Sequence, residues 1–285
     1  MNQWKIGDVK ITRIIETEGA WPGTWLLPDA TGERMQKEAE WLFPIFTDET
    51  GKLRMSIHAL IVESKGKKII VDTCIGNDKI RSNPAWSKLQ LPFLDDLKKA
   101  GYAREQIDHV VCTHLHVDHV GWNTMLKDGK WVPTFDNARY VIGGTEWDYW
   151  SHFDGKEQRD PVEDSVRPIV ERGKAELVES THRLTDEVWL EPTPGHTPGH
   201  HSVRISSKGQ EAVITGDLMH HPVQCQYPDW DDSFDSDGAQ AKKTRRAFCE
   251  KYADKNVLVF GTHFATPSCG RIVSKGDAFR FVANK

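Results

Sequence analysis

The sequence lacks the marks of a secreted, disulfide-bonded or membrane-spanning chain. Its five cysteines are odd in number and scattered, with no Cys-x-x-Cys pair, which argues against a disulfide framework. The first residues contain no apolar segment of the kind found in signal peptides. No apolar run approaches the roughly 20 residues that a membrane-spanning helix needs. These absences predict a cytoplasmic protein with reduced thiols and no membrane contact.

The sequence also lacks a dense stripe of basic residues, a linker and a serine-hydrolase motif. The formal net charge is −5, and a solvated helix face explains the short basic cluster at 242–246, so nucleic acid is not expected as a partner. No low-complexity or Pro/Ser-rich segment divides the chain, which predicts one domain spanning 1–285. The nucleophile elbow Gly-x-Ser-x-Gly is absent, which argues against a serine nucleophile.

What the sequence does contain is an ordinary globular balance, with 38% hydrophobic and 28% charged residues. Its apolar periodicity predicts both strands and helices. The expected strands are 55–62, 68–72, 109–113, 139–142, 175–178, 187–191, 202–205, 212–215 and, as the last clear one, 257–260. The expected helices are 89–100 and 238–252.

Two segments resemble each other at a constant offset of 143 residues. The stretch 58–71 and the stretch 201–214 both read as strand, Ser-Lys-Gly turn and strand. A spacing near half the chain favours two similar halves packed together over a solenoid. The alternative is a pair of unrelated hairpins with similar turns.

The strongest chemical signal is a cluster of three histidines and one aspartate directly after the apolar strand 109–113. Its members are His114, His116, Asp118 and His119. Imidazole and carboxylate are ligands that zinc prefers when thiolates are absent. Alternation along an extended backbone, followed by a turn, lets one short loop supply ligands to two adjacent metals.

Three further candidate ligands follow later predicted strands. His196 lies in the rigid Pro-Gly-His-Thr-Pro-Gly-His loop, Asp217 ends the strand of Ile-Thr-Gly-Asp, and His263 ends Phe-Gly-Thr-His. Each alone is more often an ordinary loop residue or a buried structural histidine. Together with the first cluster, they predict a binuclear metal site.

The order HxHxDH, PGHTPGH, TGD and a final His resembles the metallo-β-lactamase superfamily over residues 58–263. The resemblance implies an α/β fold, a four-layered αβ/βα sandwich of two mixed sheets flanked by helices, and the repeat fits its two halves. It also implies the ligands of the two metals. These are His114, His116 and His196 for one, Asp118, His119 and His263 for the other, and Asp217 as a bridge between them.

Such a site predicts hydrolysis. Two adjacent cations lower the pKa of a bridging water and supply hydroxide near neutral pH, and one of them polarises the substrate carbonyl. Asp118 is expected to orient the nucleophile or pass a proton to the leaving group. The expected cofactors are two divalent metal ions, with zinc favoured and iron, manganese or cobalt compatible with the same ligands.

Within that family, the chain resembles the lactonase, methyl parathion hydrolase and pyridoxolactonase branches. The second set has Asp118 and His119 in place of a cysteine-containing arrangement, and the stretch 234–252 looks like these relatives. N-acyl-homoserine lactonases commonly carry a tyrosine shortly after the bridging aspartate, where this chain has His220 and His221. Either imidazole is a candidate replacement for the hydroxyl as hydrogen-bond donor, and His220 is taken as the catalytic one.

The expected function is therefore a metal-dependent hydrolase that opens a lactone or related ester, such as a quorum-sensing-type acyl-homoserine lactone. The alternatives are an organophosphate or aryl ester hydrolase of the methyl parathion hydrolase type, and a non-catalytic relative that kept the metal site. Apolar segments at 21–27, 41–46 and 219–230, with Trp122 and Phe264, are the expected pocket walls, so a small substrate with a hydrophobic portion is expected. The N-terminal segments are also candidates for a homodimer contact.

Overall fold

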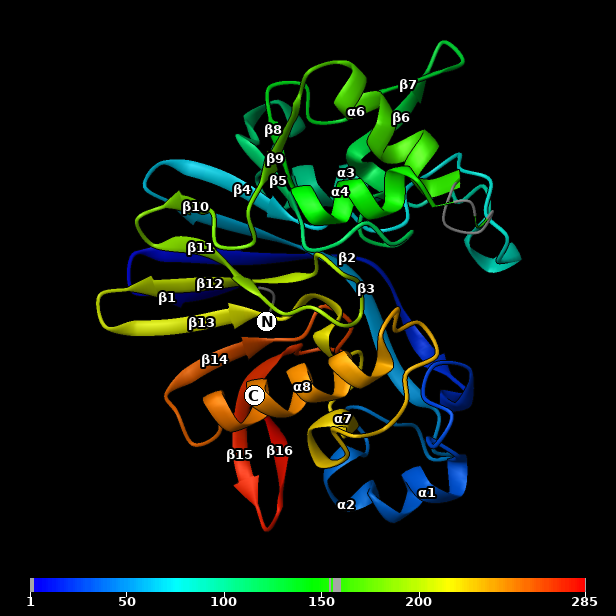
Figure 1. Cartoon of the computed structure of the whole chain (residues 1–285), viewed down its shortest axis with the longest axis vertical. Coiled ribbons are helices and arrows are strands. Elements are labelled where there is room, and N and C mark those ends of the chain that lie inside the picture. The colour runs from blue at the N-terminus through cyan, green and yellow to red at the C-terminus, as the bar shows by residue number, and fades with distance from the viewer. Residues whose placement is uncertain (1–2, 154, 156–159, 285) are drawn as a thin grey trace.

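Two mixed β-sheets packed face to face form the centre of the molecule, and helices cover their outer faces (Figure 1). The computed structural model describes residues 3–153, 155 and 160–284. Each sheet contains seven strands within this part of the chain. This confirms the α/β four-layered sandwich.

The first sheet comes from the N-terminal half of the chain. Its strand order is β1-β2-β3-β4-β5-β8-β9. Its strands are β1 (Gln3–Ile6), β2 (Val9–Trp21), β3 (Leu53–Ser64), β4 (Lys67–Val71), β5 (His109–Cys112), β8 (Arg139–Gly143) and β9 (Ala175–Val178). A separate two-stranded ribbon consists of β6 (Thr124–Lys127) and β7 (Lys130–Pro133).

The second sheet comes from the C-terminal half and runs in sequence order from β10 to β16. Its strands are β10 (Arg183–Thr185), β11 (Val188–Pro192), β12 (His201–Ser207), β13 (Gln210–Ile214), β14 (Val257–Phe260), β15 (Cys269–Lys275) and β16 (Ala278–Ala283). The helices are α1 (Gly32–Lys37), α2 (Ala39–Leu42), α3 (Phe93–Lys99), α4 (Gly144–Ser151), α6 (Arg167–Glu171), α7 (Val223–Gln226) and α8 (Gly238–Tyr252).

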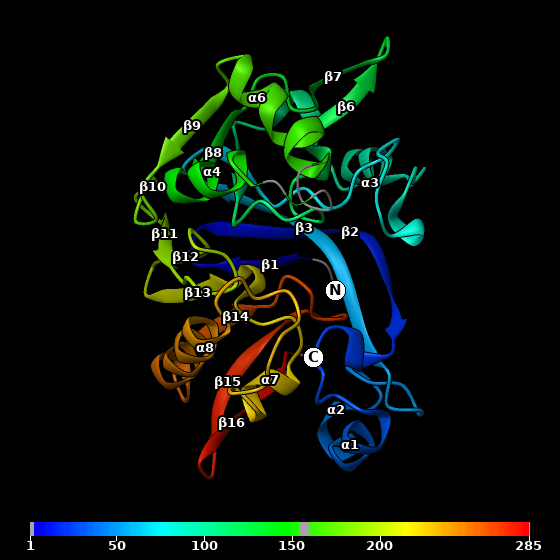
Figure 2. The same ribbon diagram turned by 45° about the vertical axis from the view of Figure 1, so that its right-hand side comes forward.

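Three layers of buried apolar side chains hold the four layers together. One lies between the two sheets and includes Val62 and Val71 from the first and Val203 and Ile214 from the second. The other two lie between each sheet and its helices, with α3, α4 and α6 on one side and α7 and α8 on the other (Figure 2). Because the central strands are covered on both faces, they read as continuous apolar runs in the sequence.

Most predicted elements are present. The ranges 175–178, 238–252 and 257–260 match β9, α8 and β14 at both ends, and the other predicted strands differ by one or a few residues. The predicted helix 89–100 is shorter, since α3 begins after Pro92, and residues 89–92 form an irregular approach. Two further strands, β15 and β16, follow 257–260, the last clear strand of the sequence, and complete the sheet edge.

The two hairpins of the sequence repeat are equivalent in the structure. The pair Leu60–Val71 of β3 and β4 corresponds to the pair Val203–Ile214 of β12 and β13, and every other pair keeps the same offset. Their turns have matching backbones, with φ of 50° and 75° at residues 65–66 and 51° and 75° at residues 208–209. In both halves the second strand of the hairpin pairs in parallel with the next strand of its sheet. Strand β4 pairs with β5, and strand β13 pairs with β14. The molecule is therefore built from two similar halves.

Helix α8 shows why the sequence folds locally as it does. The Asp237 carboxylate accepts a hydrogen bond from the Gln240 amide and caps the first turn. Its buried residues recur at helical spacing and form one stripe toward the second sheet. These residues are Ala241, Arg245, Phe248, Cys249 and Tyr252. No helix in the part of the chain that the structure describes has the length and hydropathy of a membrane span.

Candidate metal centre

The HxHxDH motif forms the loop that leaves the C-terminal end of β5. Its start is fixed to the neighbouring strand end, because the backbone amide of Thr113 donates to Asp72 Oδ1 at 2.8 Å. Its end is fixed by the amide of Thr73, which donates to the carbonyl of His119 at 2.7 Å. Within this loop, His114 and His119 are fully buried, whereas His116 and Asp118 keep partial exposure.

The second half of the chain supplies the other three predicted ligands from its own strand ends. His196 lies in the loop between β11 and β12, Asp217 lies in the short turn after β13, and His263 follows β14. The His196 loop packs against α8 so closely that a Cβ on Gly195 would lie 2.4 Å from the backbone of Ala241. Glycine is therefore required there, and its φ of 136° is also costly for other residues.

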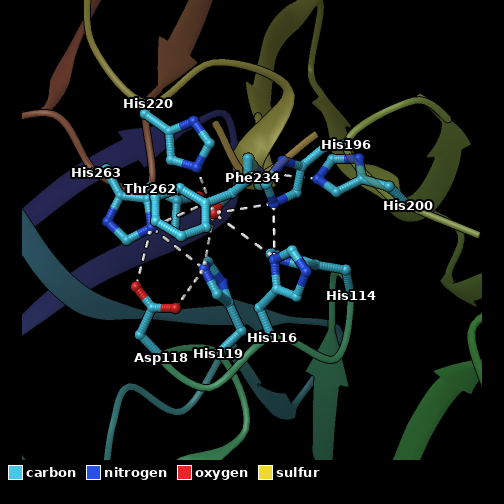
Figure 3. Close-up of polar contacts among 12 residues, drawn as sticks. His114, His116, Asp118, His119, His196, His200, His220, Phe234, Thr262 and His263 are labelled. Carbon is cyan, nitrogen blue, oxygen red and sulfur yellow. Dashed lines mark hydrogen bonds and ion pairs between the residues drawn. The ribbon is translucent and has the colours of Figure 1, made fainter. Parts of the chain in front are cut away.

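All seven residues converge on one place, where Figure 3 shows the candidate histidines and Asp118 facing one another. Asp217 lies at the centre of this cluster. Asp217 Oδ2 lies 3.7 Å from Nε2 of His114 and 3.6 Å from Nε2 of His196 on one side. The same carboxylate lies 3.1 Å from Nε2 of His119 and 3.2 Å from Nε2 of His263 on the other. Asp217 is thus within reach of both predicted ligand sets, as a bridging carboxylate must be.

Each set by itself is close enough to surround one ion. The facing atoms of His114, His116 and His196 lie within 4.8 Å of one another, and so do those of Asp118, His119 and His263. Ring nitrogens face each other directly in both sets. His196 Nε2 lies 2.9 Å from His116 Nδ1, and His119 Nε2 lies 3.2 Å from His263 Nε2.

The donor chemistry fits divalent cations. Burial lowers the pKa of His116 to about 4 and holds the pKa of His114 and His196 well below the ordinary value. These three imidazoles are therefore neutral near pH 7, which is the state that binds a metal. The Nε2 atom of His114 is buried and finds no hydrogen-bond partner among the residues that the structure describes, as expected of an atom that ligates an ion.

Further buried carboxylates hold the outer nitrogens of the histidine rings. Asp72 Oδ2 lies 2.9 Å from Nδ1 of His119, and Asp235 Oδ1 lies 3.0 Å from Nδ1 of His196. Such partners fix the orientation of a ligating imidazole and raise its basicity. Asp72 is not among the candidate residues predicted from the sequence, although an acidic residue directly after a buried strand is the same signal that identified Asp217.

A buried histidine also positions Asp217. The Asp217 amide donates to His200 Nε2 at 2.9 Å, and the other ring nitrogen of His200 lies 2.9 Å from Thr193 Oγ1. Burial lowers the pKa of His200 to about 3, so its imidazole is neutral and can accept the amide hydrogen. His200 thus has a role that its position in the PGHTPGH motif did not reveal.

The rings of the two histidines after Asp217 point in different directions. The ring of His220 points into the cluster, with Nε2 at 3.0 Å from Asp217 Oδ2 and Nδ1 at 2.7 Å from Asp232 Oδ2 (Figure 3). The ring of His221 turns into the core, where Nε2 donates to the carbonyl of Phe46 and Nδ1 accepts the amide of Val223. Of the two candidates, His220 is therefore the one that faces the site.

The expected pocket walls need a correction. Trp122 is buried in the core, stacks on Phe93 and donates its indole N–H to Glu16. Phe264 is fully buried among the aromatic residues of the second sheet. Neither presents a face to solvent, because both follow the ligand loops as those loops turn back into the core.

One aromatic residue lies in front of the cluster, and a second one contacts it. Phe234 extends over the ligands in Figure 3 and is 46% exposed. Its ring contacts that of Trp25, which is 44% exposed, at a centroid distance of 5.3 Å. Trp25 belongs to the segment 21–27 that the sequence analysis proposed as a wall, whereas Phe234 was missed as a wall residue.

The fold and the site define a two-sheet sandwich protein with a candidate binuclear metal centre at the ends of its strands. The chain belongs to the metallo-beta-lactamase superfamily, whose family model matches residues 54–276. Its curated relatives include the N-acyl homoserine lactonase AiiA of Bacillus thuringiensis subsp. kurstaki, which is 22% identical over 174 residues. That match covers 57% of this chain and 63% of the relative, so the chain spans less than two thirds of the length of the curated lactonases.

Solved structures share the fold over nearly the whole chain. AidC, a dizinc quorum-quenching lactonase in complex with a product, superposes with a TM-score of 0.81 at 22% identity, covering 99% of this chain and 97% of AidC. The hydrolase AbOPH of the beta lactamase superfamily has the same TM-score and coverage at 24% identity. At these identities the similarity establishes the fold.

Proposed function

We propose that this chain is a metal-dependent hydrolase that binds two divalent cations, zinc in the first instance, and opens a lactone or a related ester. The observation that carries the proposal is the convergence of all seven candidate ligands on Asp217. The family membership and the lactonases among the relatives support the same reaction class. A non-catalytic relative would be expected to lose ligands, and this chain keeps the full set.

Residues His114, His116 and His196 would hold one cation, and Asp118, His119 and His263 the other, with Asp217 between them. When bound, two such cations lower the pKa of water and withdraw electron density from a substrate carbonyl. The ligands come from both halves of the molecule, which supports treating residues 1–285 as one functional domain.

We assign the orientation of water, proton transfer and substrate contact to side chains in and around the cluster. Asp118 is the partly exposed carboxylate of the cluster, and we place it where it orients the attacking water or passes a proton to the leaving alcohol. His220 faces the cluster three residues after Asp217, held by Asp232, and we assign it the contact with the substrate oxygen. We also assign contact with the apolar portion of the substrate to Phe234, which lies in front of the cluster in Figure 3, and to its ring partner Trp25.

A hydrolysis panel on the zinc-loaded protein tests this proposal. The panel contains acyl-homoserine lactones, other γ- and δ-lactones, an aryl ester, a phosphotriester and a cephalosporin, each with and without chelator. Lactone turnover that chelator abolishes and that His116→Ala lacks is the expected result. Turnover of the phosphotriester alone would assign the chain to the organophosphate hydrolases, and zinc binding without any turnover would reject catalysis on these substrate classes.

A further inference from the structure

The two loops that would hold the first cation are joined by a carboxylate that belongs to neither of them. Glu146 lies in the first turn of α4, on the outer side of the first sheet, and its side chain is fully buried. Its Oε1 accepts the backbone amide of Leu115 at 3.2 Å, and its Oε2 accepts the backbone amide of Gly199 at 2.8 Å. One carboxylate thus bonds the HxHxDH loop of the first half to the PGHTPGH loop of the second half.

The two amides lie close to the candidate ligands in sequence. Leu115 stands between His114 and His116, and Gly199 lies three residues after His196. A change in the separation of these amides therefore moves the imidazoles of the first ligand set relative to one another. Metal affinity depends on how well the ligands are held in place before binding. The contact should therefore affect the affinity of the first ligand set for its cation.

A third donor connects Glu146 to the ligand ring itself. The indole N–H of Trp150, one turn along α4, donates to Glu146 Oε1 at 2.8 Å. The Trp150 ring packs against the ring of His116 at a centroid distance of 5.2 Å. Glu146 thus fixes the backbone on both sides of the first ligand set and the aromatic wall behind one of its rings.

The chain makes room for this contact. A Cβ on Gly199 would lie 2.5 Å from the backbone nitrogen of Glu146 and 3.0 Å from its carboxylate, so only glycine permits α4 to approach the loop this closely. The second glycine of PGHTPGH is therefore explained by α4, whereas the first, Gly195, is explained by α8. The loop that carries His196 is held between these two helices.

We propose that Glu146 is a positioning residue for the first cation, and that it sets the distance between the His114–His116 loop and the His196 loop. This inference rests on the proposed metal centre and goes beyond it by assigning a role to a residue that touches no ligand atom. Glutamine cannot replace it. It offers one carbonyl oxygen in place of two carboxylate oxygens, so one of the two loop amides would face an N–H₂ group and lose its acceptor.

The chain offers a matched control in Glu16. This buried glutamate also accepts two backbone amides, those of Ile75 and Gly76, and one indole N–H, that of Trp122. All three residues belong to the first half of the chain, so these contacts of Glu16 do not involve the loop that carries His196. Glu16→Gln therefore removes the same kind of contact from the fold without separating the two ligand loops.

The test measures the affinity of each of the two zinc sites by competition with a chromogenic chelator, which needs no substrate. Glu146→Gln should weaken one of the two zinc sites by about 10- to 100-fold, while Glu16→Gln leaves both unchanged. Trp150→Phe, which keeps both amide contacts, should have a smaller effect than Glu146→Gln. Gly199→Ala disturbs the same contact from the other side and should weaken the same site.

Far-UV circular dichroism on each variant separates a loss of zinc affinity from unfolding. If Glu146→Gln does not fold, the zinc affinity of Gly199→Ala tests the inference in its place. Equal zinc affinities in Glu146→Gln and Glu16→Gln, with both variants folded, would overturn the inference while leaving the metal centre intact. A wild-type protein that binds no zinc would overturn the proposed function itself, and the two failures are therefore distinguishable.

Discussion

At the scale of single residues, the structure decides which nitrogen of each histidine faces the site. The outer Nδ1 atoms of His119 and His196 lie against carboxylates, and that of His263 lies 3.1 Å from the carbonyl of Ser56. In each case Nε2 is left to point toward Asp217. His220 follows the same rule, with Asp232 behind it, which distinguishes it from its neighbour His221.

This difference predicts opposite effects of two adjacent substitutions. His220→Phe should lower kcat on the substrate identified by the panel by about 100- to 1,000-fold, the cost of removing a single hydrogen-bond donor from a transition state. The folded fraction should keep both zinc ions, although the free energy of unfolding should also fall because the buried Asp232 carboxylate loses its imidazole partner. The measurement is steady-state kinetics beside a zinc determination.

His221→Phe is the matched control. It leaves the buried carbonyl of Phe46 without its donor, so the free energy of unfolding should fall by about 1–3 kcal/mol while kcat of the folded fraction is unchanged. Burial lowers the pKa of His221 to about 4, so its ring stays neutral and keeps this hydrogen bond across the neutral range. Equal kcat values for the two variants would refute the assignment of His220.

At the scale of elements, α8 fastens the segment that contains His220, Asp232 and Asp235. The guanidinium of Arg245 is fully buried and donates to the carbonyls of Leu218, Pro228 and Trp230. It also lies 3.2 Å from Asp235 Oδ2, the carboxylate that holds His196. The buried guanidinium of Arg245 on α8 thus organises the loop that follows Asp217.

Arg245→Met should therefore lower the free energy of unfolding by about 3–5 kcal/mol, because it leaves a buried carboxylate without its partner. Arg246→Met, which removes the neighbouring exposed pair with Asp229, should cost at most about 1 kcal/mol. Urea denaturation of both variants measures the difference. Similar losses in the two would show that the buried network contributes no more than a surface pair.

The equivalent hairpins give a second prediction at this scale. Gly66 and Gly209 both have φ of 75°, and a Cβ at either position would meet no atom within 4 Å. Alanine at either site should therefore cost the same amount, about 1–2 kcal/mol of backbone strain alone. Gly238 is the control, because a Cβ there would also meet no atom within 4 Å but the residue belongs to helix α8. Alanine at this position should stabilise α8 by about 0.5–1 kcal/mol. Unequal costs at residues 66 and 209 would contradict the equivalence of the turns.

At the scale of the whole molecule, the candidate metal centre joins the two halves. His114, His116, Asp118 and His119 follow a strand of the first sheet, whereas the other three candidate ligands follow strands of the second. A bound cation therefore stabilises the native arrangement of the two sheets, since the unfolded chain cannot bring these residues together.

Removal of the metals should lower the midpoint of thermal unfolding by on the order of 10 °C. Zinc should restore it, while magnesium should not, because imidazole-rich sites suit zinc and magnesium prefers oxygen ligands. Calorimetry with chelator, and then with each metal added back, measures this. A His116→Ala, His263→Ala double variant provides the control, because its midpoint should not respond to chelator.

Individual strands and the seven candidate ligands could be predicted from the sequence, because apolar runs covered on two faces predict buried strands, and histidines or acids directly after such strands collect at one edge of a sheet. The four-layered fold was predicted through the resemblance to the family. Among the strands that the sequence did not reveal are β1, β2, β15 and β16. Strand β2 is largely buried, but its buried residues include Thr12, Arg13 and Glu16, which interrupt the apolar pattern. Strands β1, β15 and β16 each contain exposed positions, which weakens their apolar pattern.

The carboxylates that hold the candidate ligands and their loops could be found only from the tertiary structure. Asp72 and His119 are 47 positions apart, and Glu146 lies 31 positions from Leu115 and 53 from Gly199. Such contacts depend on how two sheets and their helices pack, which no window of sequence contains. The choice between His220 and His221 has the same origin, because adjacent side chains after a turn point in different directions and packing alone selects the one that faces the site.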